Sequence, residues 1–325
     1  MKEITYLAAL IEAMREEMER DERVLLLGQG VEAGGSYKTA VGLLDRFGRE
    51  RVRDVPISEE TVVGCAVGAA MTGLRPIVEI LYCDFIFRAM DQIGNQAAKY
   101  RYMSGGQISI PVVIRTTSGY GSCRGATHSQ TLGTMLFTIP GLKVALPSTP
   151  RDVKGMLKSA IRDDDPVIFL DHFLLFPLKG PVPEEEYTIP LGRAEVKREG
   201  KDITVVDLST MVHEALRAAE DLAREGVEAE VVDPRTLVPL DLTTLVQSVK
   251  KTNHLMVVEP GAQRGGLGAE VIACIVKEAF DHLDAPPVRL AVPDTPIPFA
   301  SSMENYVLPN RAQIAKEVRA HLGLG

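Results

Sequence analysis

The sequence lacks the features that mark several large classes of protein. Its 325 residues contain no block of basic side chains, and the formal net charge is −8, so nucleic acid is not expected as a partner. No hydrophobic run approaches the length of a membrane span, and residues 1–22 carry too many charges for a signal peptide. We therefore expect a cytoplasmic protein that binds neither nucleic acid nor a membrane.

Paired cysteines and short catalytic motifs are also absent. The sequence contains no GxxxxGK(S/T) phosphate loop, no GxGxxG after an expected strand, and neither HExxH nor GxSxG. Hydrolysis by a bound metal ion or an activated serine is therefore disfavoured. The four cysteines show no CxxC spacing, so we interpret them as reduced thiols: they are Cys65, Cys83, Cys123 and Cys274.

One glycine-rich run allows two interpretations. Gly261–Gly268 lies between an expected strand and an expected helix, where backbone N–H groups can receive an anion. A flexible turn at a domain or subunit contact explains the same residues, and we favour the turn.

Apolar segments that alternate with helical patterns are the main positive feature. In the first half, each expected strand is a nearly continuous apolar run, which is typical of a parallel sheet covered by helices on both faces. The second half repeats this alternation. We expect strands at residues 24–27, 51–55, 75–81, 111–117, 142–146, 167–170, 203–208, 227–233, 254–259 and 288–292. Asp84 is expected to cap a helix that runs to about Tyr100, and Thr149-Pro150 to open the helix before the strand at 167–170.

The composition changes between Phe176 and Leu191, where four prolines accompany an acidic run. Such a stretch is typical of an exposed linker between domains. The chain is long enough for two hydrophobic cores. We therefore predict an α/β protein with two parallel-sheet domains, at residues 1–175 and 192–325, joined by a linker at 176–191.

Residues 54–73 contain an expected helix with two carboxylates in its first turn. From Glu59 to Met71 this helix is apolar on nearly all sides, which predicts burial, and Ser58 is expected as its N-cap. Glu59 and Glu60 stand in its first turn. One interpretation is that both carboxylates interact favourably with the helix dipole. The other is that one of them is a carboxyl group at the water-excluded edge of the core, where it can exchange a proton. The residues alone leave both interpretations open.

Three chemically distinct side chains follow expected strands. His128 lies in a Gly/Ser/Thr-rich loop after the strand at 111–117, while Glu59 and Phe85 follow the strands at 51–55 and 75–81. The carboxyl ends of parallel strands are where α/β folds bind ligands. A carboxylate, an imidazole and an aromatic ring are thus expected at one rim, although three unrelated loop residues remain the alternative.

Longer stretches resemble the β subunit of the thiamin-diphosphate-dependent 2-oxoacid dehydrogenases, a transketolase-like family that includes the pyruvate, branched-chain 2-oxoacid and acetoin enzymes. The resemblance covers essentially the whole chain and implies a pyrimidine-binding domain followed by a transketolase C-terminal-like domain. It also implies oxidative decarboxylation of a small 2-oxoacid with acyl transfer to a lipoyl group. The stretches that carry it include DVPISEE, DFIFRAMDQIGNQAAKYRYMSGGQ, THSQ, PGLKVALPSTPRDVKGMLKSAIRDDDPVIFL, VVDPRTLVPLD and KTNHLMVVEPG.

The resemblance assigns roles to four residues. Glu59 matches the glutamate that hydrogen-bonds a ring nitrogen of the cofactor's aminopyrimidine, and Ile57 belongs to the same motif. Phe85 matches the aromatic residue that packs on the pyrimidine, with simple core packing as the alternative. His128 matches a histidine expected to hold the 2-oxoacid or to assist acyl transfer to lipoamide.

The resemblance also implies partners. Thiamin enzymes grip the diphosphate and Mg²⁺ through a GDG motif that this sequence lacks, so an α subunit is expected to supply that half of the site in an α₂β₂ heterotetramer. A lipoyl acyltransferase core is a further expected partner. Backbone carbonyls are implied to hold potassium, with an acidic helix end as the alternative interpretation; the matching residues are Val112, Ala160, Ile161, Asp163 and Asp165.

One departure from the family keeps other functions open. Gln29 stands where the family usually has an acid after the first strand. An acetoin-cleaving or transketolase-like split thiamin enzyme is one alternative, although sugar phosphates call for basic side chains and we find few besides Arg124. A non-catalytic paralogue that binds partners is the other alternative.

Overall fold

The computed structural model describes residues 1–324, which form two compact units. Unit 1 comprises Met1–Gly119 and Met135–Leu191, and unit 2 comprises Tyr120–Thr134 together with the chain from Gly192 onward. The segment Tyr120–Thr134 was predicted within the first domain, but its contacts are with the second unit.

Unit 1 is built on a parallel sheet with the strand order β6-β7-β5-β4-β2-β3. Every neighbouring pair in this order is parallel, which confirms the predicted α/β class. Because the strands run parallel, their carboxyl ends lie at the same edge of the sheet. The strands are β2 (Val24–Gly28), β3 (Val52–Asp54), β4 (Arg75–Ile80), β5 (Val113–Ser118), β6 (Lys143–Ala145) and β7 (Val167–His172).

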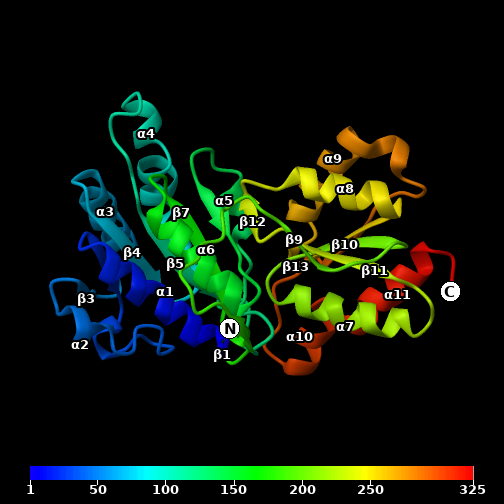
Figure 1. Cartoon of the computed structure of the whole chain (residues 1–325), viewed down its shortest axis with the longest axis horizontal. Helices are drawn as coiled ribbons and strands as arrows, with labels where there is room; N and C mark the ends of the chain where they lie inside the picture. The colour runs from blue at the N-terminus through cyan, green and yellow to red at the C-terminus, as the bar shows by residue number, and fades with distance from the viewer. Residues whose placement is uncertain (325) are drawn as a thin grey trace. The chain divides into compact units, whose positions relative to one another are not determined.

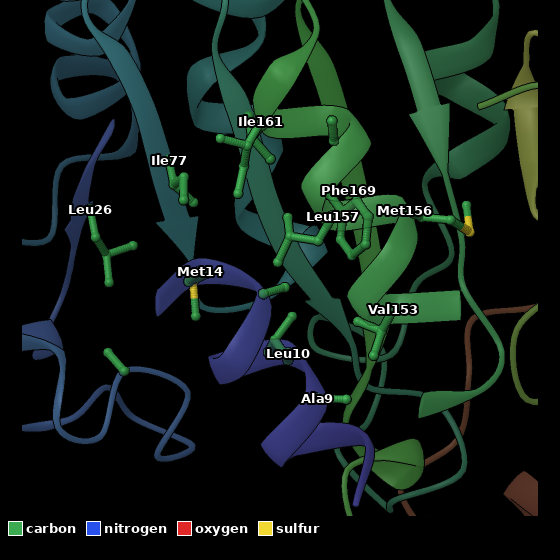
Figure 2. Close-up of a cluster of buried hydrophobic side chains, with 14 of the residues drawn as sticks. Ala9, Leu10, Met14, Leu26, Ile77, Val153, Met156, Leu157, Ile161 and Phe169 are labelled. Carbon is green, nitrogen blue, oxygen red and sulfur yellow. The ribbon is translucent and has the colours of Figure 1, made fainter. Parts of the chain in front are cut away.

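Two amphipathic helices, α1 (Tyr6–Arg20) and α6 (Pro150–Arg162), pack together over the core of unit 1 (Figure 2). Thr149 caps α6 by accepting a hydrogen bond from the Asp152 backbone N–H, and Pro150 follows at the first helical position, as the sequence predicted. The apolar side chains of this cluster are drawn in Figure 2, and they include Leu10, Met14, Leu26, Ile77, Leu157 and Phe169.

The remaining elements of unit 1 are short. A single helix was expected from Asp84 to about Tyr100, but the chain forms a 3₁₀ helix, a π turn and one turn of α-helix there, and Asp84 is buried inside the first of these. Such irregular helices are frequent at functional sites. The short elements are η1 (Val31–Ala33), α2 (Leu43–Phe47), η2 (Cys83–Ala89), η3 (Gln92–Ala97), α4 (Tyr100–Met103), α5 (Gly133–Phe137) and η4 (Phe173–Leu175).

The segment 176–191 is not the exposed linker that its prolines suggested. Its strand β8 (Lys179–Val182) pairs antiparallel with β1 (Lys2–Thr5). Phe176, Val182 and Ile189 are buried in the core of unit 1. The apolar residues between the prolines therefore decide the position of this segment, because they cover surface that would otherwise be exposed to water.

Unit 2 has a second sheet with the order β14-β13-β10-β11-β9, parallel except for its edge strand β9. Helices α7 and α11 pack together on one side of this sheet, and α8 and α9 on the other (Figure 1). The elements are β9 (Glu195–Arg198), β10 (Ile203–Asp207), α7 (Met211–Ala223), β11 (Ala229–Asp233), β12 (Thr236–Val238), α8 (Leu242–Thr252), β13 (Leu255–Ala262), α9 (Leu267–Ala279), η5 (Phe280–His282), β14 (Val288–Val292), α10 (Ser301–Val307) and α11 (Arg311–His321).

Within residues 1–324, no helix has both the length and the apolar character required to cross a membrane.

An unusual buried carboxyl group ends strand β10. Asp207 is fully buried, and neither of its carboxylate oxygens has a hydrogen-bond partner among the described residues. Burial raises the pKa of Asp207 well above its usual range, and the nearby Asp233 raises it further, while Lys197 opposes the shift.

We expect the unfolding free energy to depend on pH through Asp207. Because its pKa is higher in the folded chain than in the unfolded chain, its contribution is intact below pH 4. That contribution is lost as the pH rises towards the folded-state value, by about 1.4 kcal/mol per pH unit between the two values. Asp207→Asn removes this dependence, so the variant gains stability relative to wild type from acid to neutral pH in urea unfolding. Parallel pH profiles for the two proteins would contradict the assignment.

Candidate active site

The two acidic residues in the first turn of α3 (Glu59–Met71) differ in their exposure to water, which residue type and position alone did not indicate. The Glu59 side chain is 11% exposed, whereas Glu60 is exposed. The Oε2 atom of Glu59 is buried and has no hydrogen-bond partner within residues 1–324. Ser58 occupies the N-cap position as expected, but its hydroxyl makes no capping hydrogen bond. Glu59 is therefore a carboxylate with unused hydrogen-bonding capacity.

Helix α3 is only partly buried, which corrects the prediction from its apolar composition. One face packs on β4, η2 and η3, with Val63 and Ala66 fully buried. The opposite face is exposed at Thr61, Cys65 and Gly68. A groove of about 600 Å³ runs between this face and the ends of β2 and β3. Composition alone cannot tell burial inside one chain from burial against another.

A small cavity of about 20 Å³ lies beside Glu59. The strand register explains its walls, because Gly28 of β2 pairs with Glu79 of β4 and with Asp54 of β3, so the residues that follow these strands meet at one edge. A Cβ atom at position 28 would lie 2.9 Å from that of Glu79, so the approach of the two strands requires glycine. The lining residues are Gln29, Val55, Pro56, Ile57, Ser58, Glu59, Val62, Glu79, Ile80 and Leu81.

The 3₁₀ helix η2 carries the other residues of this site. The Phe85 ring packs edge-on against Tyr82 with centroids 5.7 Å apart, and the Tyr82 hydroxyl is hydrogen-bonded to that of Tyr37. Side chains three residues apart nearly eclipse on a 3₁₀ helix, so Arg88 lies on the same side as Phe85. The Arg88 Nε atom is 3.4 Å from Glu59 Oε2. Arg88 was not among the residues predicted from the sequence, although its position three residues after Phe85 could have indicated it.

The predicted site residues are divided between the two units. Ile57, Glu59 and Phe85 belong to unit 1, and Ile57 is 73% exposed at the rim. His128 belongs to unit 2, where it is half-buried with its Nδ1 3.0 Å from the hydroxyl of Thr127. Ile57 and Glu59 line the same small cavity of unit 1, and Phe85 lies on the helix η2 that packs against α3, while the shared rim with His128 stays a prediction.

A buried ion-pair network lies behind the cavity. Arg115 of β5 is 1% exposed and donates hydrogen bonds to Glu79 of β4 and, at 2.5 Å, to Asp171 of β7. Glu79 also accepts a hydrogen bond from the Thr39 hydroxyl at 2.8 Å. Burial alone would lower the pKa of Arg115, but its two carboxylate partners raise it, so the guanidinium stays charged. Glu79 is thus held by hydrogen bonds from Arg115 and Thr39, whereas Glu59 keeps open hydrogen-bonding capacity.

The residues implied for potassium already bond to other groups. The carbonyls of Val112 and Ala160 accept backbone N–H groups, and that of Asp163 accepts a hydrogen bond from Arg75. The Asp165 carboxylate pairs with Arg101 and Lys143. Within residues 1–324, no cluster of three His, Cys, Asp or Glu side chains is arranged to hold a metal ion. Potassium binding at Val112, Ala160, Ile161, Asp163 and Asp165 stays a prediction.

The glycine-rich run Gly261–Gly268 forms the turn between β13 and α9. The amino terminus of α9 is occupied by the chain's own carboxylate, because Glu259 Oε1 accepts the Gly268 N–H at 3.2 Å and Arg289 at 2.7 Å. A Cβ atom at Gly268 would lie 2.8 Å from both side chains. The run is therefore a turn that packs tightly against an internal ion pair, and the structure does not support an anion site there.

Comparison with known proteins identifies the class. The family model for the transketolase pyrimidine-binding domain matches residues 2–175, and that for the transketolase C-terminal domain matches residues 192–314. A solved structure described as a split gene transketolase, inactive beta4 tetramer, is 25% identical with a TM-score of 0.80 and covers 99% of each chain. The chain is thus a transketolase-like protein of two α/β domains.

Closer relatives define the family within this class. The chain is 45% identical over 323 residues to pyruvate dehydrogenase E1 component subunit beta-2 of Oryza sativa, covering 98% of this chain and 86% of that protein. It is 44% identical to 2-oxoisovalerate dehydrogenase subunit beta of Bacillus subtilis, covering 98% of each, and 43% identical to acetoin:2,6-dichlorophenolindophenol oxidoreductase subunit beta of that organism, covering 97% and 96%. The chain belongs to the family of 2-oxoacid dehydrogenase E1 β subunits.

We expect the buried network to be essential for stability. Arg115→Met leaves the carboxylates of Glu79 and Asp171 buried without their cation, so the free energy of unfolding should fall by about 3–5 kcal/mol in urea titrations. Arg53→Met, at an exposed position, is the matched control and should change stability by no more than about 0.5 kcal/mol. An Arg115→Met protein as stable as the control would show that the network contributes nothing.

Proposed function

We propose that this chain is the β subunit of a thiamin-diphosphate-dependent enzyme that decarboxylates a small 2-oxoacid oxidatively and passes the acyl group to a lipoyl group. The names of its relatives support the reaction class. The observation that carries the assignment is the buried Oε2 of Glu59, which has no hydrogen-bond partner in the described chain and lies at the carboxyl edge of the sheet. This atom fits a ring nitrogen that must share a proton.

The residues of unit 1 fit the pyrimidine half of the cofactor. Glu59 would accept or donate the shared proton at Oε2, while Phe85 and Ile57 would contact the flat ring. Tyr82 supports the Phe85 ring from its edge. Thiamin diphosphate, when bound, supplies the electron sink for loss of carbon dioxide. His128 would hold the substrate or assist the transfer of its acyl group.

Arg88 and Gln29 lie near Glu59 and affect its orientation and its hydrogen bonding. Arg88 places a guanidinium group beside the Glu59 carboxylate and restricts its orientation by charge attraction. Gln29 lines the same cavity with a neutral amide, which can donate or accept a hydrogen bond but cannot exchange a proton at neutral pH. Proton exchange in this cavity therefore falls to Glu59.

We propose that an α subunit completes the site. The exposed face of α3 and the adjacent groove leave apolar surface in water, which favours a protein partner there. That subunit would bring the groups that hold the diphosphate and Mg²⁺, in an α₂β₂ assembly that serves a lipoyl acyltransferase core. The split transketolase structure, described as an inactive beta4 tetramer, is consistent with β-type chains that need a partner.

Acetoin cleavage is a second candidate, since the acetoin relative is almost as similar as the others at 43% identity. The similarities do not separate the substrates. Parallel assays of pyruvate, branched-chain 2-oxoacids and acetoin with the reconstituted complex would assign the substrate class.

We expect Glu59→Gln to lower the rate of cofactor-dependent decarboxylation by about 10²–10⁴-fold in the reconstituted complex, because an amide cannot share a proton. Steady-state rates with the preferred 2-oxoacid measure this effect, and size-exclusion chromatography should show unchanged assembly. Glu60→Gln changes the exposed neighbour and should retain wild-type activity. Full activity in Glu59→Gln would refute the proposed mechanism.

Dependence on a partner gives a separate expectation. This chain alone should show no decarboxylation and little binding of thiamin diphosphate in isothermal titration calorimetry, since the site described covers only the pyrimidine half. Addition of an α subunit that contains the GDG motif should restore both. Tight binding or turnover by the isolated chain would show that it holds a complete site.

A further inference from the structure

The loop Tyr120–Thr134, which carries His128, is part of unit 2. Its first half has a demanding backbone: Cys123 has a φ angle of 58°, and Gly121 and Gly125 each have a φ of 75°. A residue with a side chain adopts this left-handed conformation only when its surroundings hold it there. The loop therefore needs fixed contacts to keep its shape.

Glu304 of α10 supplies two of those contacts. Its Oε1 accepts the backbone N–H of Gly121 at 2.9 Å, and its Oε2 accepts that of Cys123 at 2.7 Å. Glu304 itself is 1% exposed, so the two hydrogen bonds satisfy a carboxylate that is withheld from water. A residue about 180 positions further along the chain thus fixes the start of the loop.

Other contacts attach the rest of the loop to unit 2. The Tyr120 hydroxyl lies 2.7 Å from the hydroxyl of Thr210, and Thr131 donates a hydrogen bond to the Pro260 carbonyl at 3.3 Å. The backbone at Gly125 lies against Phe299, which precedes α10. His128 lies between these attachments. Among the contacts named here, those of Glu304 involve a charged side chain.

We propose that Glu304 is a positioning residue for the reaction: its carboxylate holds the loop in the shape that places the imidazole of His128. This inference rests on the proposed function and gives unit 2 a direct part in it. A carboxylate suits the task because both of its oxygens accept hydrogen bonds, and two N–H groups point at them. The amide of glutamine offers one acceptor and turns an N–H group towards another N–H group.

The test compares Glu304→Gln and Glu304→Asp with wild type in the reconstituted complex, and Glu220→Gln at an exposed site of α7 is the matched control. In Glu304→Gln, the backbone amide hydrogens of residues 120–134 should exchange with solvent faster than in wild type. Trypsin should also cleave this variant faster after Arg124, which is exposed. Its kcat for acyl transfer should fall by about 10- to 100-fold, because small displacements of a reacting group are that costly. Glu304→Asp, which keeps the charge, should recover part of the rate.

A double-mutant cycle separates positioning from general stabilisation. In a His128→Ala background, Glu304→Gln should lower the remaining rate by less than about twofold, because the group that it positions has gone. Binding of thiamin diphosphate, assigned to unit 1, should be unchanged. Additive losses in the cycle, or wild-type exchange of residues 120–134 in Glu304→Gln, would overturn the proposal.

Failure of the proposed function gives a different result. A wild-type complex that turns over no 2-oxoacid and no acetoin refutes the proposed reaction, and with it the catalytic part of this inference. Hydrogen exchange and proteolysis of the loop would still decide whether Glu304 holds it in place.

Discussion

A carboxylate oxygen that is removed from water without a hydrogen bond is costly, and the candidate site depends on one such oxygen. Glu59 Oε2 is in this state at the first turn of α3. Arg88 offsets part of the cost through its charge, but it leaves the hydrogen-bonding capacity open. Binding of a ligand that donates a hydrogen bond to this oxygen is therefore favourable. This connects the first turn of α3 to the proposed binding of the cofactor.

The surrounding sheet leaves Oε2 of Glu59 available for a hydrogen bond, because the neighbouring Glu79 is already hydrogen-bonded. Adjacent parallel strands place Glu79 opposite Arg115, which also donates a hydrogen bond to Asp171 of β7, so the carboxylate of Glu79 next to the cavity is paired with a cation. An unpaired Glu79 in the cavity wall would repel the carboxylate of Glu59. The buried network thus separates a structural carboxylate from a chemically available one, although both lie near the carboxyl ends of the strands.

The two units contribute in different ways. Unit 1 holds Glu59 on α3 and Phe85 on η2, whereas in unit 2 Glu304 accepts hydrogen bonds from the loop of His128. The apolar face of α3 that this chain leaves exposed is consistent with a site that a second subunit completes.

The sequence by itself determined the parallel α/β class, the cap of α6 and the candidate residues Glu59, Phe85 and His128, because these follow from short-range pattern and from resemblance. Only the tertiary structure showed that Glu59 is largely withheld from water while Glu60 is exposed, left one face of α3 exposed, packed apolar residues of the segment 176–191 into the core of unit 1 and placed the loop Tyr120–Thr134 with unit 2. It also brought Arg88 to Glu59, and Glu304 to a loop about 180 residues away. Composition and periodicity report what a residue prefers, but burial, ion pairing and long-range hydrogen bonds depend on which distant segments fold against it.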